Sequence, residues 1–122
     1  MERNFESLRV WQQARVFVNS IYDAMEGVKD YGFRDQIQRA AVSIMNNIAE
    51  GVESGTDAKY VNFLNISCGS CSEVRSMLYL CVDRQMITRE QFLSLKADAI
   101  LISNQLYRLI ESIKKSPPHS RL

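Results

Sequence analysis

The feature that most constrains the fold is a long helical repeat of apolar residues that no proline interrupts. Proline occurs only at Pro117 and Pro118, so its ring bars no earlier residue from a helix. Residues 60–81 and 92–113 each place apolar or small side chains at alternating steps of four and three. This spacing is typical of the seam between helices packed in left-handed bundles and coiled coils. The seams are Tyr60, Leu64, Ser67, Cys71, Val74, Leu78 and Cys81 in one segment, and Phe92, Leu95, Ala99, Ile102, Leu106, Leu109 and Ile113 in the other.

Two earlier segments also have helical periodicity. Turn-like stretches at 27–32, 51–56 and 84–88 separate the four segments. Thr56 is a good N-cap, and Thr88 has the capping-box spacing to Gln91. In the first segment the expected apolar face consists of Leu8, Trp11, Val18, Ile21, Tyr22 and Met25, and Val10, Ala14 and Phe17 widen it. In the second segment it consists of Phe33, Ile37, Ala40, Ala41, Ile44, Ile48 and Val52.

No segment has the alternation of a strand, and short links favour antiparallel neighbours. We therefore predict an all-α protein, an antiparallel up-down four-helix bundle over residues 1–115. A flexible C-terminal tail is expected at 116–122, after Lys114 and Lys115 in the last helical turn.

Cys68-Gly69-Ser70-Cys71 has the spacing of a redox or metal-binding dithiol. A thioredoxin-type pair lies at a helix N-terminus, where the helix dipole lowers the thiol pKa, whereas this pair follows about 12 residues of helical pattern. The further metal ligands would be Cys81, about 15 Å along the helix, and His119 in the tail. We therefore assign both cysteines to packing, Cys71 on the seam, and predict that Gly69 marks a close helix crossing.

A polar stripe runs beside the apolar face of the second segment. It consists of Gln36, Arg39, Ser43, Asn47 and Glu50, and Ser70 with Glu73 repeats the pattern in the third segment. One interpretation is a solvated face. The other is a partly buried network in which Arg39 pairs with Glu50 or Glu73, while Ser43 and Asn47 form hydrogen bonds across helices. In that case the small side chains of Ala40 and Ala41 allow the two helices to approach closely. The expected helix-packing residues are Trp11, Ala40, Ala41, Gly69 and Cys71.

Composition leaves little room for catalysis. The only histidine is His119, and the chain lacks a Glu-x-x-His pair, a glycine-rich phosphate loop and a Ser/His/Asp set. Glu50 and Glu73 fit an ion pair with Arg39 better than a pair of catalytic carboxylates. We expect no enzymatic activity, no cofactor and no small-molecule substrate. The charged N-terminus predicts no signal peptide, and no apolar run approaches bilayer length, so the expected compartment is the cytoplasm.

Three stretches carry a resemblance to a known family. "FESLRVWQQA" (5–14), "QIQRAAVSIMNNIAEG" (36–51) and "GSCSEV" (69–74) resemble the four-helix-bundle proteins encoded in intervening sequences of bacterial 23S rRNA genes. Met45-Asn46 stands where members more often have Pro-Ala, and the link at 27–32 is shorter than in many of them. The resemblance implies a homopentamer without known enzymatic activity. It also implies distant kinship to accessory variability proteins of diversity-generating retroelements, pentamers that bind nucleic acid and a reverse transcriptase.

Two functions follow as hypotheses. The first is a homo-oligomeric scaffold that binds RNA or DNA through basic side chains repeated round a ring, although the net charge of the chain is only +1. The second is a protein-interaction scaffold without a nucleic-acid role. Some apolar residues, such as Ile66, Leu80 and Leu93, lie beyond one seam and would be exposed in a monomer. They support oligomerisation under either hypothesis. The candidate nucleic-acid contacts are Arg34, Lys59, Arg75, Arg84, Arg89, Lys96 and Arg108.

Overall fold

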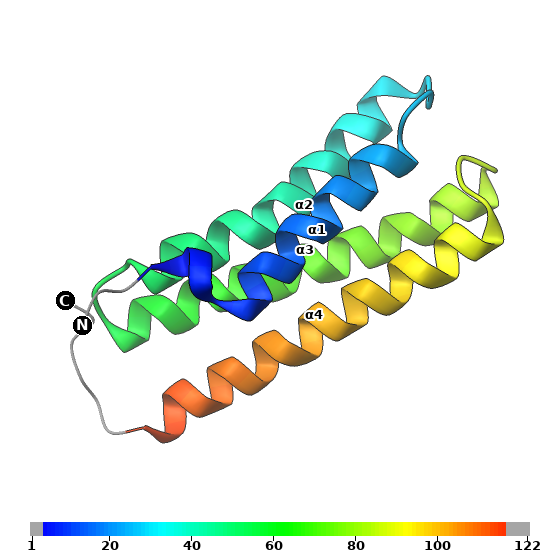
Figure 1. Ribbon diagram of the computed structural model, residues 1–122. Helices are drawn as coiled ribbons and strands as arrows, with labels where there is room; N and C mark the ends of the chain where they lie inside the picture. The colour runs from blue at the N-terminus through cyan, green and yellow to red at the C-terminus, as the bar shows by residue number, and fades with distance from the viewer. Residues whose placement is uncertain (1–3, 117–122) are drawn as a thin grey trace.

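The computed structural model describes residues 4–116, and within that range it contains helices and no strand. A short 3-10 helix, η1 (Phe5–Ser7), precedes α1 (Arg9–Ala24), α2 (Tyr31–Val52), α3 (Asp57–Asp83) and α4 (Arg89–Lys115). The helices alternate in direction and lie side by side (Figure 1). The predicted all-α antiparallel four-helix bundle is confirmed. Except for Ser116, the expected tail lies outside the described residues, and so does His119.

Side-chain caps begin three of the helices. The Asp30 carboxylate accepts the Phe33 N–H at 3.2 Å, and Thr56 Oγ1 accepts the Lys59 N–H at 3.2 Å. At α4 the predicted capping box is complete: Gln91 N–H donates to Thr88 Oγ1 at 3.1 Å, and Thr88 N–H donates to Gln91 Oε1 at 2.8 Å. These caps satisfy backbone donors that a helix start leaves unpaired, and so they set where each helix begins.

The four helices form a ring in chain order. Each packs against the next and α4 closes onto α1, while the backbones of the two diagonal pairs do not approach each other. The contact of α2 with α3 is the most extensive, and that of α1 with α4 is the least extensive of the four. The weakest side of the bundle is therefore the one where the first and last helices meet.

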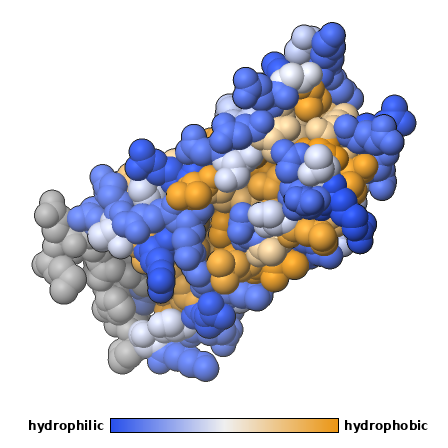
Figure 2. Space-filling view, turned by 45° about the vertical axis from the view of Figure 1, so that its right-hand side comes forward, coloured by the Kyte–Doolittle hydropathy of each residue, from blue (hydrophilic) through white to orange (hydrophobic). Residues whose placement is uncertain are grey.

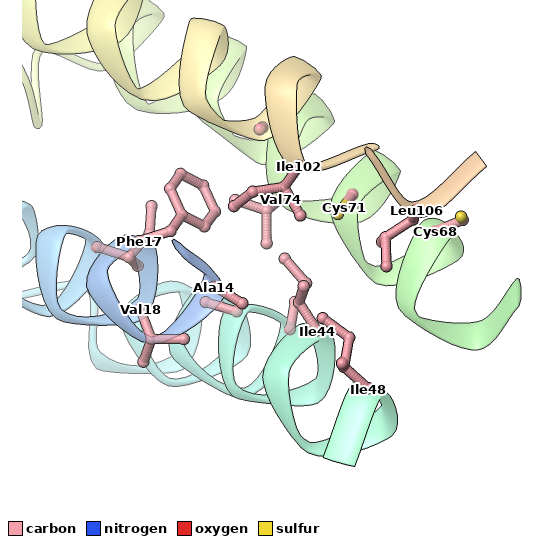
Figure 3. Close-up of a cluster of buried hydrophobic side chains, with 14 of the residues drawn as sticks. Ala14, Phe17, Val18, Ile44, Ile48, Cys68, Cys71, Val74, Ile102 and Leu106 are labelled. Carbon is pink, nitrogen blue, oxygen red and sulfur yellow. The ribbon is translucent and has the colours of Figure 1, made fainter. Parts of the chain in front are cut away.

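Inward-facing apolar side chains of all four helices build one core. Ala14 and Phe17 of α1 meet Ile44 of α2, Val74 of α3 and Ile102 of α4 (Figure 3). Both predicted seams are buried except at Leu109, which is half-buried while its neighbour Ile110 is buried. A straight helix drifts by about 20° per heptad against a strict seven-residue repeat, which explains this one-residue slip near the end of α4.

In α1 the burial differs from the expected face at Tyr22. This side chain is exposed, whereas Ala14 and Phe17, expected only to widen the face, are at the centre of the core. Tyr22 follows Ile21 by about 100° round the helix, so it cannot share the inward position that Ile21 occupies. The placement of Tyr22 on the core face was wrong.

The close helix crossing occurs at Gly51 and not at Gly69. A methyl group at Gly51 would lie 3.0 Å from Tyr60 Cδ1, 3.1 Å from Phe63 Cβ and 3.3 Å from the Tyr60 carbonyl oxygen. At Gly69, which is exposed, a methyl group would meet no atom of residues 4–116 within 4 Å. The prediction that Gly69 marks a crossing was wrong, because Gly69 lies on the solvent side of α3.

These two glycines should respond to substitution in opposite directions. We expect Gly51→Val to lower the free energy of unfolding by about 1–3 kcal/mol, because the added carbons meet the α3 backbone and cannot be accommodated by a rotamer change. Gly69→Ala should raise it by about 1 kcal/mol through helix propensity. Urea denaturation of both variants measures the effect. A destabilised Gly69→Ala protein would show that another surface covers this glycine in solution.

Candidate functional site

The three cysteines are buried in α3. Burial raises the pKa of the Cys68 thiol, and it raises the pKa of Cys81 to about 11. Burial, together with repulsion from Cys68, raises the pKa of Cys71 to about 12. A reactive thiol needs the opposite shift, because only the thiolate is the nucleophile and metal ligand. Cys68 and Cys71 therefore lie in an environment that holds them protonated.

Buried hydroxyl groups join α2 to α3. Ser70 Oγ donates to Ser43 Oγ at 2.8 Å, and Ser67 Oγ donates to the Ile44 carbonyl oxygen at 2.9 Å. On α2, Asn47 Nδ2 donates to the carbonyl oxygen of Ser43 at 2.9 Å and to its Oγ at 3.0 Å. Ala40 and Ala41 are buried beside these groups. We call Ser43, Asn47, Ser67 and Ser70 the α2–α3 hydroxyl cluster.

The rest of the polar stripe is on the surface. Gln36 Nε2 donates to Glu73 Oε2 at 3.3 Å between exposed side chains, and Glu50 is also exposed. Arg39 pairs with Asp35 of its own helix at 3.1 Å, with the two side chains 81% and 60% exposed. The expected pairing of Arg39 with Glu50 or Glu73 was wrong. Arg39 lies eight residues before Asn47, about 80° round the helix, and so faces solvent.

Most of the candidate basic residues are far apart. Arg84 and Arg89 flank the α3–α4 turn and Lys59 lies near the opposite end of α3, while Arg108 is on the outer face of α4. Arg34 is engaged locally: its guanidinium stacks 4.8 Å from the Tyr31 ring centroid and donates to the Val28 carbonyl oxygen at 3.4 Å. The structure does not gather these five cations into one patch.

Lys96 packs against two aromatic rings, and Arg75 lies one turn before one of them on α3. Lys96 Nζ lies 5.4 Å from the ring centroid of Tyr79 and 5.8 Å from that of Phe92. The two rings meet edge to face at 4.9 Å. Tyr79 is 47% exposed, and the exposed Arg75 precedes it by one turn of α3. We call Arg75, Tyr79, Phe92 and Lys96 the α3–α4 cluster.

Sequence reasoning missed both aromatic members of the α3–α4 cluster. Phe92 was assigned to the seam alone, and Tyr79 was not assigned. Arg75 with Tyr79 and Phe92 with Lys96 share the i,i+4 spacing that places two side chains on one helix face. This spacing could have identified each half of the cluster, although not their meeting across two helices.

Large apolar side chains also lie on the outside of the bundle. Ile66, Leu80 and Leu93, which the sequence placed beyond one seam, are exposed, and so is Val16 of α1. Trp11, by contrast, is buried and packs edge to face on Phe5 with 5.0 Å between ring centroids. The exposed set comprises Val16, Tyr22, Tyr31, Ile66, Tyr79, Leu80, Leu93, Leu101 and Tyr107.

Within residues 4–116, no three of the His, Cys, Asp and Glu side chains are grouped as metal ligands would be. None of the described helices is both long enough and apolar enough to cross a lipid bilayer.

Comparisons with known proteins agree with this architecture. The family model described as 23S rRNA-intervening sequence protein matches residues 6–108. A crystal structure of a protein of unknown function from the S23 ribosomal protein family of Bacteroides thetaiotaomicron VPI-5482 is similar, with 29% sequence identity and a TM-score of 0.79. The similarity covers 84% of this chain and 98% of that one. No curated protein matches the sequence significantly.

The α2–α3 hydroxyl cluster should stabilise the fold as a coupled unit. We expect Ser70→Ala to lower the free energy of unfolding by about 0.5–1.5 kcal/mol, because it removes the hydrogen bond to Ser43. Ser43→Ala combined with Ser70→Ala should cost less than the sum of the single changes. Urea denaturation measures all three. Arg39→Ala is the control and should change the value by less than about 0.5 kcal/mol, since its ion pair is exposed.

The fold should weaken at alkaline pH through Cys71. The unfolded thiol ionises near its ordinary pKa of 9.0, while the folded thiol stays protonated up to about 12. Its contribution to stability is therefore intact below pH 9 and is lost as the pH rises from there toward 12. We expect it to account for a loss of up to about 1.4 kcal/mol per pH unit in that range. Urea denaturation of wild type and Cys71→Ala at several alkaline pH values should show a flatter pH dependence in the variant; equal slopes would contradict the assignment.

Proposed function

The chain belongs to the 23S rRNA-intervening sequence protein family, and from that premise we propose that it is a non-enzymatic scaffold that assembles with copies of itself and binds RNA or DNA. The assembly is a cyclic oligomer, and the number five rests on the family resemblance alone. The single observation that carries the nucleic-acid role is the α3–α4 cluster.

The outer apolar side chains support self-assembly. Ile66 and Leu80 lie on the outer side of α3, and Leu93 lies on the outer side of α4; each is about half exposed. Exposed apolar surface of this kind marks contacts between protein chains. A head-to-tail contact repeated round an axis closes into a ring.

The α3–α4 cluster supports nucleic-acid binding because it combines the two contacts that single strands use. The half-exposed Tyr79 ring offers a face on which a base stacks, a contact that tolerates any base sequence. Lys96 and Arg75 lie beside the ring and can reach backbone phosphates. Repetition of the cluster round a ring multiplies these contacts, which offsets the low net charge of each copy.

A protein-interaction scaffold without nucleic-acid binding is the second candidate. It is favoured by the net charge of +1 and by the scattered positions of Arg34, Lys59, Arg84, Arg89 and Arg108. The two candidates share the assembly and differ only in the role of the α3–α4 cluster.

Binding of a labelled single-stranded RNA of about 20 nucleotides at several salt concentrations separates the two candidates. We expect affinity to fall as salt rises, and Lys96→Gln to reduce the slope by about 0.7 for each phosphate that Lys96 neutralises. Tyr79→Ala should weaken binding at every salt concentration, because stacking is not ionic. Lys29→Gln, an equal charge change on the exposed α1–α2 link, is the control.

Light scattering on the same samples gives the mass of the assembly. RNA binding that the Lys96 and Tyr79 variants leave unchanged would contradict the proposed site. A monomer of 14.0 kDa would contradict the assembly.

A further inference from the structure

A groove runs between α1 and α4 on the weakest side of the bundle. It consists of two adjoining hollows that share Asp98. The first, of about 180 Å³, is walled by Val16 and Phe17 of α1 and by Leu101 and Ile102 of α4. The second extends from Asp98 toward Asp23 and Glu90. Figure 2 shows hydrophobic residues gathered along the middle of this face between hydrophilic margins. We call the two hollows the α1–α4 groove.

The charge of the α1–α4 groove has one sign. Asp23, Glu90 and Asp98 line it, and none of its lining residues is a lysine or an arginine. The hollows elsewhere on the described surface are mixed: one holds Asp57 with Lys114, and another holds Glu111 with Arg108. Of these hollows, only the α1–α4 groove combines an apolar wall with purely acidic charge.

Two groups in the groove are poorly solvated. Gln13 Oε1 is buried and accepts a hydrogen bond from none of the described residues. Burial raises the pKa of the Asp98 carboxyl group, which shows that the folded chain only partly stabilises its charged form. Gln13 and Asp98 line the same hollow, and a hydrogen-bond donor that enters it would meet the Asp98 carboxylate.

We propose that the α1–α4 groove is a docking site for a basic amphipathic helix of a partner protein. One large apolar side chain of that helix enters the hollow between Val16 and Leu101. A lysine or arginine about one turn away reaches Asp98, and a second reaches Asp23 and Glu90. The arrangement is the helix-in-groove mode of recognition, with acidic margins that select a basic helix.

The dimensions fit this occupant. A cavity of about 150 Å³ holds a benzene-sized group, so the first hollow, at about 180 Å³, accommodates one leucine or phenylalanine side chain. Glu90 and Leu101 are eleven residues apart on α4, which corresponds to about 16 Å of helix axis. A partner helix of three turns spans that length.

The charge also argues against two other occupants. A two-fold contact between two copies through this groove would place Asp23, Glu90 and Asp98 against their own equivalents, which is unfavourable. The head-to-tail contact of a ring presents a different surface of the second copy, and the mass measurement below tests that contact. Nucleic acid would bring phosphates against the same carboxylates. The inference is therefore independent of the RNA binding proposed for the α3–α4 cluster.

A labelled 15-residue model helix with leucine on one face and lysine on the other tests the groove by fluorescence anisotropy. We expect binding by the full chain, and no binding of the same peptide with glutamate in place of lysine. Leu101→Lys should weaken binding at least tenfold, because it fills the hollow and repels the peptide. Tyr107→Lys is the matched control, since Tyr107 is 53% exposed against 48% for Leu101, lies on the same helix and does not line the groove. Asp98→Asn should weaken binding while leaving the apolar wall intact.

Equal affinity of the Leu101→Lys and Tyr107→Lys proteins for the peptide would overturn the proposal. It is also overturned if the peptide does not bind and Leu101→Lys alone lowers the mass in light scattering, because a second copy of the chain then covers the groove. That second result would contradict the docking site but not the proposed self-assembly. Failure of the docking site can therefore be told apart from failure of the proposed function.

Discussion

The close packing of α2 against α3 is the contact on which the rest of the bundle depends. At one end Gly51 brings the two backbones together over Tyr60, and along the interface Ser67 and Ser70 donate hydrogen bonds to α2. Polar groups so placed must find partners, which fixes the register of the two helices as well as their distance. Helices α1 and α4 then pack on opposite edges of this pair, and they meet each other least extensively. The bundle is therefore packed most closely between α2 and α3 and least closely between α1 and α4.

This asymmetry gives the bundle two different surfaces that share α4. On the side toward α3, Lys96 lies over Tyr79 and Phe92. On the side toward α1, Asp98 joins Asp23 and Glu90 beside an apolar wall. Lys96 and Asp98 are two positions apart, which separates them by about 200° round the helix axis. Their opposite charges therefore face opposite sides of α4. The site proposed for nucleic acid and the groove proposed for a basic helix therefore lie on opposite sides of α4.

The sequence predicts well those features that depend on local chemistry and periodicity. The seam spacing predicted the helices and most of the core, and Thr56 and Thr88 marked two helix starts correctly. It predicts poorly where the outcome depends on rotation about a helix axis or on a contact between distant segments. Gly51 and Gly69 are both helical glycines, and only the position of α3 relative to α2 distinguishes the crowded one from the open one. Glu50 and Glu73 were the carboxylates expected for Arg39, and it pairs instead with Asp35, one turn earlier on its own helix.

The same limitation applies to charge. A net charge of +1 argues against a polyanion-binding surface if the charge is spread evenly over the molecule. The charge on α4 cannot be spread evenly, because Leu95, Ala99 and Ile102 must face the core. The residues between them therefore lie on the two flanks of the helix. The charges of Lys96 and Asp98 cancel in the net charge of the chain, although the two side chains face opposite sides of α4. The relevant quantity for function is therefore the charge on each flank of a helix, and that quantity follows once the seam of the helix is known.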